Sequence, residues 1–211
     1  METTSADDQF IIEYRLLELY HKKRKSRSST KPTHPVLKKP LQESASKRTR
    51  IPASANTDAL VQVADKLTDI VDNLPPAQNQ VVTDSDQDVI QRLVEILKEY
   101  GDNFDEKIAK DAELLSYLQG LFSYNLFEKL ASAFIVSMEL PGKLREEDND
   151  QKMKIAWTFE MTSRLSALDL QPMNRTMGFG AQYVHQNFTP WIQQHGGWAN
   201  AFKIDEGDEV H

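Results

Sequence analysis

Apolar residues recur every three or four positions in each candidate folded segment of this 211-residue chain, a spacing that places them on one face of an α-helix. An early example is Leu60, Val63 and Leu67, a stripe that ends before Pro75 and Pro76. No segment alternates apolar and polar residues as a half-buried strand does, and no Asn-Gly or Asp-Gly turn joins strand-like runs. We therefore predict an all-α fold.

The breaks in this period divide the chain into a short N-terminal helix and a bundle of seven or eight further helices. Thr189 followed by Pro190 is typical of a helix start, and Gly196 with Gly197 is typical of a helix end, so we expect a short separate helix between them. The ranges predicted to be helical are 8–20, 57–73, 86–110, 112–118, 121–140, 152–169, 174–187, 189–195 and 198–202.

The charge is distributed very unevenly along the chain. Residues 21–50 contain eleven Lys or Arg and one acid, a net charge of +10, whereas the rest contains 14 basic and 31 acidic residues, a net charge of −17. The polar stretch 21–56 buries too little apolar surface to offset its chain entropy, so we predict that it is disordered. The predicted domains are an N-terminal extension (1–56, with the helix 8–20), a helical bundle (57–204) and an acidic tail (205–211).

The composition excludes several classes of function. Without cysteine there is no disulfide and no thiolate site, and no stretch approaches the roughly 18–20 apolar residues of a membrane span. We expect a cytosolic protein with neither a secretory signal nor a transmembrane anchor. The five histidines lack the spacing of a metal site, and Gly178 and Gly180 follow no predicted strand, so they do not form a dinucleotide loop. We expect no enzymatic activity, no metal and no cofactor.

Two tryptophans flank a double glycine near the end of the chain: Trp191, Ile192, Gly196, Gly197 and Trp198. The pattern resembles the second homology motif of the Bcl family of apoptosis regulators. We expect the tryptophans to pin the terminal helices to the bundle and the glycines to permit a tight turn, with contact to a partner as the alternative.

A second pattern lies on the predicted helix 86–110. Four apolar residues at positions i, i+4, i+7 and i+11 share one face, and a small residue and an acid precede the last of them. The residues concerned are Leu93, Leu97, Tyr100, Gly101, Asp102 and Phe104. The pattern resembles the third homology motif of the same family, in which the glycine allows close approach to a receptor and the acid pairs with a receptor cation. The bland alternative is a core helix packed inward.

Both motifs occur in family order, and the chain resembles the Bcl-G branch in particular, over roughly 57–204. The resemblance implies a globular bundle around a central pair, 152–169 and 174–187. It also implies a pro-apoptotic regulator that binds other Bcl family proteins by laying its 86–110 helix into a groove. Two other readings stay open: a survival-type receptor for the helices of other family members, and a non-apoptotic adaptor targeted by its basic N-terminal arm.

The chain departs from the family pattern at two places. The first homology motif has no clear match, so Lys152 or Lys154 would have to replace the arginine that receives the acid of a partner helix. The central helices also carry Thr158, Glu160 and Arg164, and are less apolar than a pore-forming hairpin. These departures weigh against groove binding and against direct membrane permeabilisation.

The candidate targeting arm is the basic run Lys22, Lys23, Arg24 and Lys25. Such a run is typical of a nuclear address or a peripheral contact with acidic membrane, and its structural alternative is a solvated linker. Few aromatic residues interleave with these charges, which argues against a nucleic-acid partner. A nuclear or membrane-peripheral pool therefore stays open beside the cytosolic one.

Overall fold

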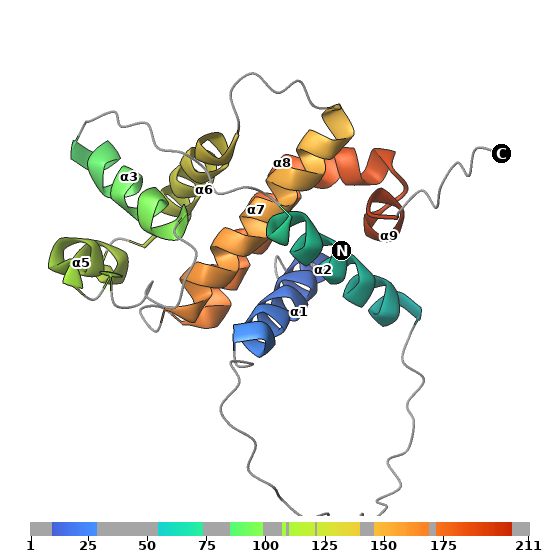
Figure 1. Ribbon diagram of the computed structural model, residues 1–211, viewed down its shortest axis with the longest axis horizontal. Coiled ribbons are helices and arrows are strands. Elements are labelled where there is room, and N and C mark those ends of the chain that lie inside the picture. The colour runs from blue at the N-terminus through green and yellow to red at the C-terminus, as the bar shows by residue number, and fades with distance from the viewer. Residues whose placement is uncertain are drawn as a thin grey trace, which may run out of the picture.

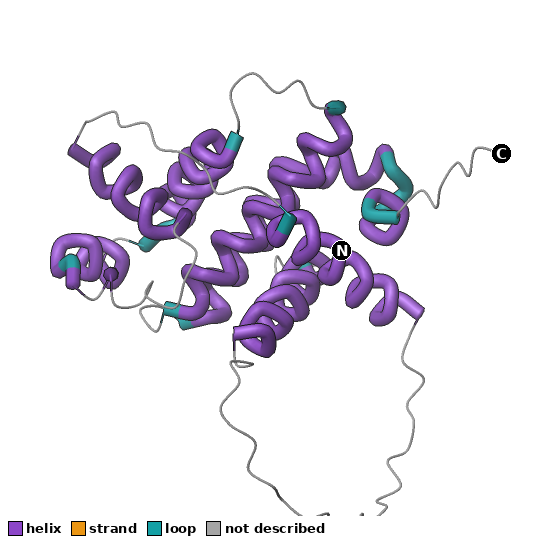
Figure 2. The backbone as a smooth tube through the Cα atoms, viewed as in Figure 1, coloured by secondary structure: helices purple, strands orange, loops and turns teal. Residues whose placement is uncertain are grey.

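The computed structural model describes residues 10–28, 55–73, 85–98, 107–108, 110–120, 122–139, 146–168 and 172–203 (Figure 1). Within these ranges the fold is all-α, as predicted, and contains no strand (Figure 2). Eight helices have defined bounds: α1 (Ile11–Ser28), α2 (Ala55–Asp72), α3 (Ser85–Lys98), α5 (Ala112–Gly120), α6 (Tyr124–Met138), α7 (Glu147–Ala167), α8 (Met173–Gln194) and α9 (Trp198–Ala201). No helix in this described part is long and apolar enough to cross a membrane.

Helix α7 is the centre of the bundle, because it is buried on nearly all sides and packs against α8, α2, α1 and α6 (Figure 1). Trp157 and Phe159 are among its buried apolar side chains. The buried hydroxyls of Thr158 and Thr162 donate to the carbonyls one turn earlier, at 2.8 and 2.7 Å, so they carry no unsatisfied hydrogen-bonding group into the core. The pairing of α7 with α8 agrees with the predicted central pair.

The predicted end of the first helix at residue 20 is wrong, because α1 continues to Ser28. The prediction treated the basic residues after position 20 as solvated, but three of them face carboxylates of α2. Arg24 and Arg27 pair with Asp72, and Lys23 pairs with Asp65. Since α2 has no basic residue in its last turn, Arg24 and Arg27 also oppose the negative end of the α2 dipole.

The predicted boundary at residue 56 is also wrong for α1, which belongs to the bundle. The helix packs against α2, α7 and α8, and its side chains Leu16, Leu17 and Tyr20 are completely buried. Burial of such side chains contributes about 1.5–3 kcal/mol each, enough to hold an 18-residue helix in place. The predicted disorder of residues 29–54 and the acidic tail 205–211 lie outside the described residues.

A separate helix starting at Thr189 does not form, because α8 continues through Pro190 to Gln194. A proline inside a helix costs about 3 kcal/mol, since it lacks the N–H donor and crowds the preceding turn. On this helix Val184, Phe188 and Ile192 are buried at successive four-residue steps. Their burial offsets that cost, so the apolar ridge continues past the proline.

α7 begins at Glu147, five residues before the predicted start at 152, and its first turn is rich in acids that favour a helix N-terminus. The other helices agree with the predicted ranges to within a few residues, where the structure describes them. α6 begins after Ser123, whose hydroxyl accepts a hydrogen bond from the N–H of Leu126 at 3.3 Å. The predicted helix 86–110 is observed as α3 up to Lys98, and residues 99–106 lie outside the described part.

Gly180 allows α8 to approach its neighbours closely. A Cβ atom at this position would lie 2.5 Å from the Cγ2 atom of Thr162 and 3.1 Å from the Cδ1 atom of Leu17, on α7 and α1. A Cβ atom at Gly178, on the same helix, would meet nothing within 4 Å. Gly180 is therefore needed for close helix packing, whereas Gly178 has space for a side chain. Both lie within α8 and form no ligand loop.

We expect Gly180→Ala to lower the free energy of unfolding by about 1–3 kcal/mol, because Thr162 or α1 must shift to admit the methyl group. Gly178→Ala is the matched control, and should raise stability by up to about 1 kcal/mol through helix propensity. Urea denaturation of the two variants measures both effects. Equal stability of the two variants would show that α8 is not closely packed at Gly180.

Candidate functional site

The third-motif helix α3 turns its described apolar anchors inward. Leu93 and Leu97 have 0% of their surface exposed, and Val89 is buried on the same face. The other motif residues lie outside the described part of the chain: Tyr100, Gly101, Asp102 and Phe104. Two of the four predicted ligand anchors are thus core residues in this state of the protein.

Helix α3 lies at the edge of the bundle beside α6, and polar contacts also tether it (Figure 1). Arg92 on the outer side of α3 pairs with Asp111 at 3.0 Å, with Glu113 at 2.8 Å and with Asp88 at 3.3 Å. Its hydrogen bond to Glu113 is the main cause of a raised Arg92 pKa. This tether joins α3 to the start of α5.

Arg164 of α7 holds the other end of α3. Its Nη1 atom donates a hydrogen bond to the backbone carbonyl oxygen of Leu97, in the last turn of the helix. This bond ties the backbone near the end of the described part of α3 to the central helix. The same guanidinium donates through Nε to Oε1 of Glu160 at 2.8 Å.

The buried Glu160 is the centre of a polar cluster that reaches the surface at Asp72, here called the Glu160 cluster: Tyr20, Arg24, Asp72, Glu160 and Arg164. The Tyr20 hydroxyl and the Arg24 Nε donate to Oε2 of Glu160 at 2.5 and 2.7 Å. The Nη1 atom of Arg24 lies 2.6 Å from Oδ1 of Asp72. The buried carboxylate is thus paired with guanidinium groups, as a buried charge requires.

The titration of the Glu160 cluster reflects its burial. Desolvation, reinforced by the neighbouring Glu160 carboxylate, holds the pKa of Tyr20 well above its usual value near 10. Burial alone would lower the pKa of Arg24, but Tyr20, Glu160 and Asp72 outweigh it, so this pKa is raised. Arg24 therefore remains charged and Tyr20 remains neutral throughout the physiological range.

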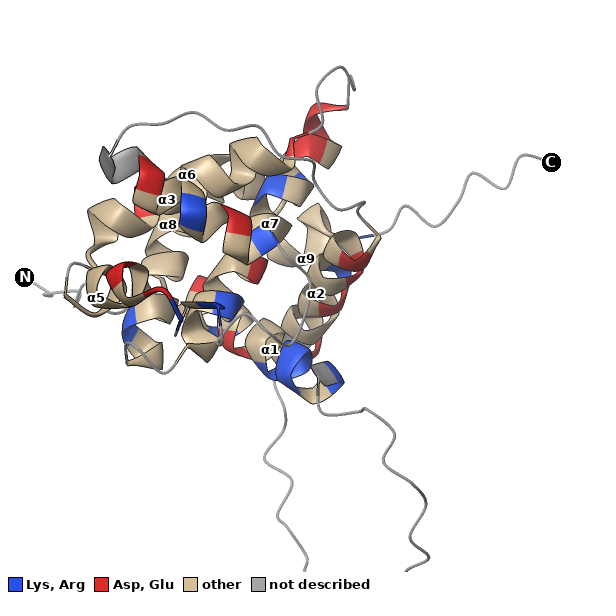
Figure 3. Cartoon of the chain, turned by 60° about the vertical axis from the view of Figure 1, so that its left-hand side comes forward, with Lys and Arg blue, Asp and Glu red and all other residues tan. Residues whose placement is uncertain are grey.

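The predicted targeting arm is helical, and two of its four residues are engaged within the molecule. Figure 3 shows the basic residues of α1 close to the acidic residues of α2. Lys23 pairs with Asp65 and Arg24 belongs to the Glu160 cluster, whereas Lys22 and Lys25 are exposed. The basic run is therefore not a free arm in this state.

The second-motif residues form the junction of α8 and α9. Gly196 and Gly197 have φ angles of 76° and 90°, and their N–H groups bond back to the carbonyls of Gln193 and Ile192. These two bonds form the turn that commonly closes a helix with glycine in the left-handed region. The predicted helix end at the two glycines is thus confirmed.

Both tryptophans of the motif fasten this junction to α7. Trp198 is buried, stacks on Phe202 and meets the ring of Phe159 edge-on at 6.0 Å. The Nε1 of Trp191 donates to Oδ1 of Asp148 at 3.1 Å, and this hydrogen bond is the first cause of a lowered Asp148 pKa. Ile192, between them in sequence, is a core residue.

The lysine considered as a replacement for the missing first-motif arginine is already engaged. Lys154 lies 3.2 Å from Glu139 and 2.8 Å from Asp150, and these hydrogen bonds raise its pKa. A partner carboxylate would have to compete with both acids. Lys152, the other candidate, is half-buried on the turn before it.

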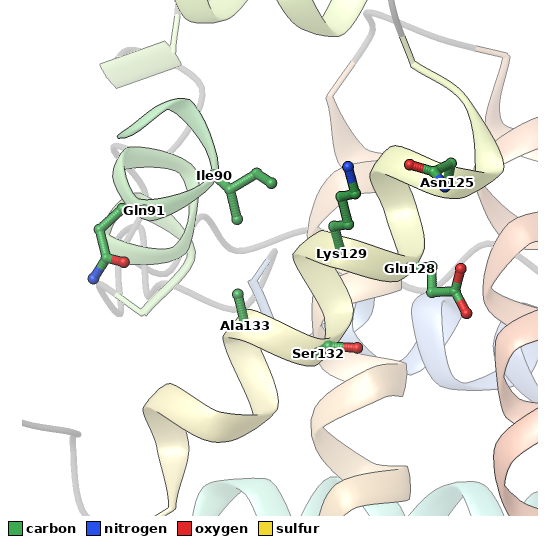
Figure 4. Close-up of a pocket in the computed structure, with 7 residues that line it drawn as sticks. All are labelled: Ile90, Gln91, Asn125, Glu128, Lys129, Ser132 and Ala133. Carbon is green, nitrogen blue, oxygen red and sulfur yellow. The ribbon is translucent and has the colours of Figure 1, made fainter. Parts of the chain in front are cut away.

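A cleft of about 500 Å³ opens between α3 and α6. Ile90 of α3 and Lys129 and Ala133 of α6 face one another across it (Figure 4). The α6 wall also carries Asn125, Glu128 and Ser132, so most of the lining residues are of polar type. On the same helix, Val136 is 67% exposed.

The Glu160 cluster is not predicted by the sequence pattern, although two of its members stand out there as polar residues of a central helix. Glu160 and Arg164 were interpreted as polar interruptions of a central helix, whereas they form an i,i+4 ion pair. A Glu four residues before an Arg on an apolar helix was the available signal. Their partners on α1 are more than a hundred residues away in sequence.

Metal chemistry has no support among the described residues, where no group of three or more His, Asp or Glu side chains is arranged to hold an ion.

Comparison with known proteins identifies relatives by sequence. The human apoptosis facilitator Bcl-2-like protein 14 is 36% identical over 129 residues, which cover 61% of this chain and 39% of that protein. The Bos taurus protein of the same name is 33% identical over 121 residues, covering 57% and 36%. Human Bcl-2-like protein 12 is 28% identical over 169 residues, covering 74% and 65%. No family model and no solved structure matches.

The all-α bundle around a buried helix and these relatives agree with the predicted resemblance to the Bcl family. The relatives at 33% identity or more share the name Bcl-2-like protein 14, so the similarity is to the Bcl-G branch. The chain spans about two fifths of the length of these Bcl-2-like protein 14 relatives.

We expect the free energy of unfolding to fall as the pH rises above about 10. Because the folded pKa of Tyr20 is raised, its contribution is fully present below the unfolded pKa of about 10 and is lost as the pH approaches the folded value. Tyr124, with a pKa of about 12, contributes with the same sign. Urea denaturation at pH 8, 9, 10 and 11 measures the slope.

Tyr20→Phe is the control for this slope. At pH 8 it should cost about 1.5–3 kcal/mol, because Glu160 loses a hydrogen-bond donor. Above pH 10 its stability should fall less steeply than that of the parent. Parallel curves would mean that Tyr20 does not remain neutral in the folded protein.

Proposed function

We propose that the chain is a pro-apoptotic regulator that acts through protein–protein contact, by placing α3 in the groove of another Bcl family protein. The observation that carries the proposal is the apolar face of α3, on which Leu93 and Leu97 stand one turn apart. The relatives that share the matched region are named apoptosis facilitators, which supports the same direction of action.

Release of α3 from this bundle needs a receptor that replaces its core contacts. Each buried anchor contributes about 1.5–3 kcal/mol, and a domain has only about 5–15 kcal/mol of net stability. The position of α3 limits the loss, because α3 is at the edge of the bundle and packs mainly on α6. A groove that buries Leu93 and Leu97 again would restore most of the free energy lost.

A survival-type receptor is the second candidate, and the cleft between α3 and α6 is the observation that favours it. A helix-binding groove is normally lined by apolar residues, whereas five of the seven residues that line this cleft are of polar type: Gln91, Asn125, Glu128, Lys129 and Ser132. The acids around Lys154 would also repel the aspartate of an incoming helix. Both features favour the ligand role over the receptor role.

Cytosolic action and a peripheral contact with acidic membrane complete the proposal. The membrane contact would have to draw Lys23 and Arg24 away from the acids that they pair with in the bundle. Lys22 and Arg27 are exposed, and would meet an acidic surface first.

We expect the double variant Leu97→Ala, Asp102→Glu to lose partner binding and death-promoting activity in cells that express the full chain. The substitutions remove one anchor and move the acid of the third motif. Cell viability and co-precipitation with Bcl family partners measure the two effects. Leu114→Ala of α5 is the matched control, since this leucine is equally buried and its loss costs a similar 2–5 kcal/mol without touching the motif.

Full death-promoting activity of the double variant would contradict the ligand role of α3. Saturable binding of helical peptides from pro-apoptotic relatives to the parent chain, at micromolar strength or about −8 kcal/mol, would instead establish the receptor role. Equal loss of activity in the Leu114→Ala control would assign the effect to stability and remove the support for α3.

A further inference from the structure

A continuous line of polar contacts joins α1 to α3 through the centre of the bundle. Tyr20 and Arg24 of α1 bind Oε2 of Glu160, Oε1 of Glu160 binds Arg164, and Arg164 binds the carbonyl oxygen of Leu97 in α3. We propose that this line is a lock, in which the seating of α1 holds the C-terminal end of α3 in the bundle. The lock would control when α3 can leave the bundle to act as a ligand, and its biological meaning rests on the proposed ligand role of α3.

The α3 end of the lock is a hydrogen bond to the backbone. Leu97 lies near the end of the described part of α3, and its carbonyl oxygen accepts from the Nη1 atom of Arg164 on α7. A charged donor makes a stronger hydrogen bond than a neutral one. Removing Arg164 would therefore loosen this end of α3 from α7.

In the middle of the lock, the two oxygens of the Glu160 carboxylate bind different arginines, Arg24 and Arg164. Arg24 and Tyr20 occupy Oε2 of Glu160, so Arg164 binds Oε1 through its Nε while its Nη1 reaches Leu97. A carboxylate and a guanidinium without competitors prefer two parallel hydrogen bonds. If α1 departed, Oε2 would become available and would draw the Nη groups of Arg164 away from the carbonyl.

The α1 end of the lock can be released without dismantling the central pair. α1 contributes Leu16, Leu17 and Tyr20 to the core, whereas its C-terminal third is held by the ion pairs of Arg24 and Arg27 with acids of α2 and α7. The exposed pair of Arg27 with Asp72 exchanges readily with water. The pair of Arg24 with the buried Glu160 costs more to break, so release of α1 needs a competing acid for Arg24. Loss of α1 would then free Arg164 from the carbonyl of Leu97 and favour the transfer of α3 to a receptor groove.

Hydrogen exchange measured by mass spectrometry on the isolated full chain tests the lock. We expect Arg24→Gln to speed exchange about tenfold in α1 and also in α3, a change that corresponds to about 1.4 kcal/mol of local stability. Arg164→Gln should speed exchange in α3 by a similar factor. In the Arg164→Gln background, Arg24→Gln should add no further change in α3, because the line is already broken.

Lys23→Gln is the matched control on α1, since it removes an ion pair with Asp65 that lies outside the line. It should leave the exchange of α3 within about twofold of the parent. Exchange in α8 serves as the internal reference for global unfolding. If Arg24→Gln unfolds the whole chain, Arg24→Lys, which keeps the charge but loses the planar fork, replaces it with the same expectation.

Faster exchange in α1 with no change in α3 would overturn the lock, as would additive effects of Arg24→Gln and Arg164→Gln on α3. The measurement needs no partner and no cells. Failure of the lock is therefore distinguishable from failure of the proposed function, which would appear in the viability and binding experiments with the exchange result intact.

Discussion

A single buried carboxylate constrains the arrangement of four helices. Glu160 is 6% exposed at the middle of α7, and a charged group in such a place is tolerated only with partners of opposite charge and with its lone pairs satisfied. Those partners come from α7 itself and from α1, and Arg24 extends the contact to Asp72 of α2. Arg164 carries it to α3. The position of α1, the pairing of Asp72 in α2 and the attachment of α3 all follow from the need to accommodate this one charge.

The Glu160 cluster contributes more to uniqueness than to bulk stability. Buried ion clusters are often no more stabilising than apolar side chains of the same size, because desolvation consumes much of the attraction. The apolar contacts of α1, chiefly Leu16 and Leu17, would tolerate a shift of the helix along its axis. The hydrogen bonds of Tyr20 and Arg24 to one oxygen of Glu160 would not. We infer that the apolar face holds α1 on the bundle and the Glu160 cluster fixes its register.

Local sequence patterns were sufficient to predict most of the helices, but they did not predict the contacts between the helices. The four-residue spacing of Leu93 and Leu97 predicted α3, and the double glycine predicted the end of α8. The extension of α1 was missed because the residues after position 20 look solvated until the acids of α2 are seen beside them, more than forty positions later. The passage of α8 through Pro190 was missed for a similar reason, since the packing of its flanks outweighs the local signal of the proline. The candidate site shows the same difference. The apolar face of α3 with Leu93 and Leu97 was predicted from local spacing, whereas the polar contacts that join it to α1 through Glu160 and Arg164 were not.

A double-mutant cycle between Arg24 and Glu160 measures whether the buried carboxylate fixes α1 through this arginine. The free energy of unfolding would be measured for the parent, Arg24→Gln, Glu160→Gln and the double variant. If Glu160 fixes α1 through Arg24, each single variant leaves a buried charge without its partner and costs about 3–5 kcal/mol. The double variant should then cost at least about 1.5 kcal/mol less than the sum of the two. Costs that add to within about 0.5 kcal/mol would show that the two side chains act independently, and would contradict the account.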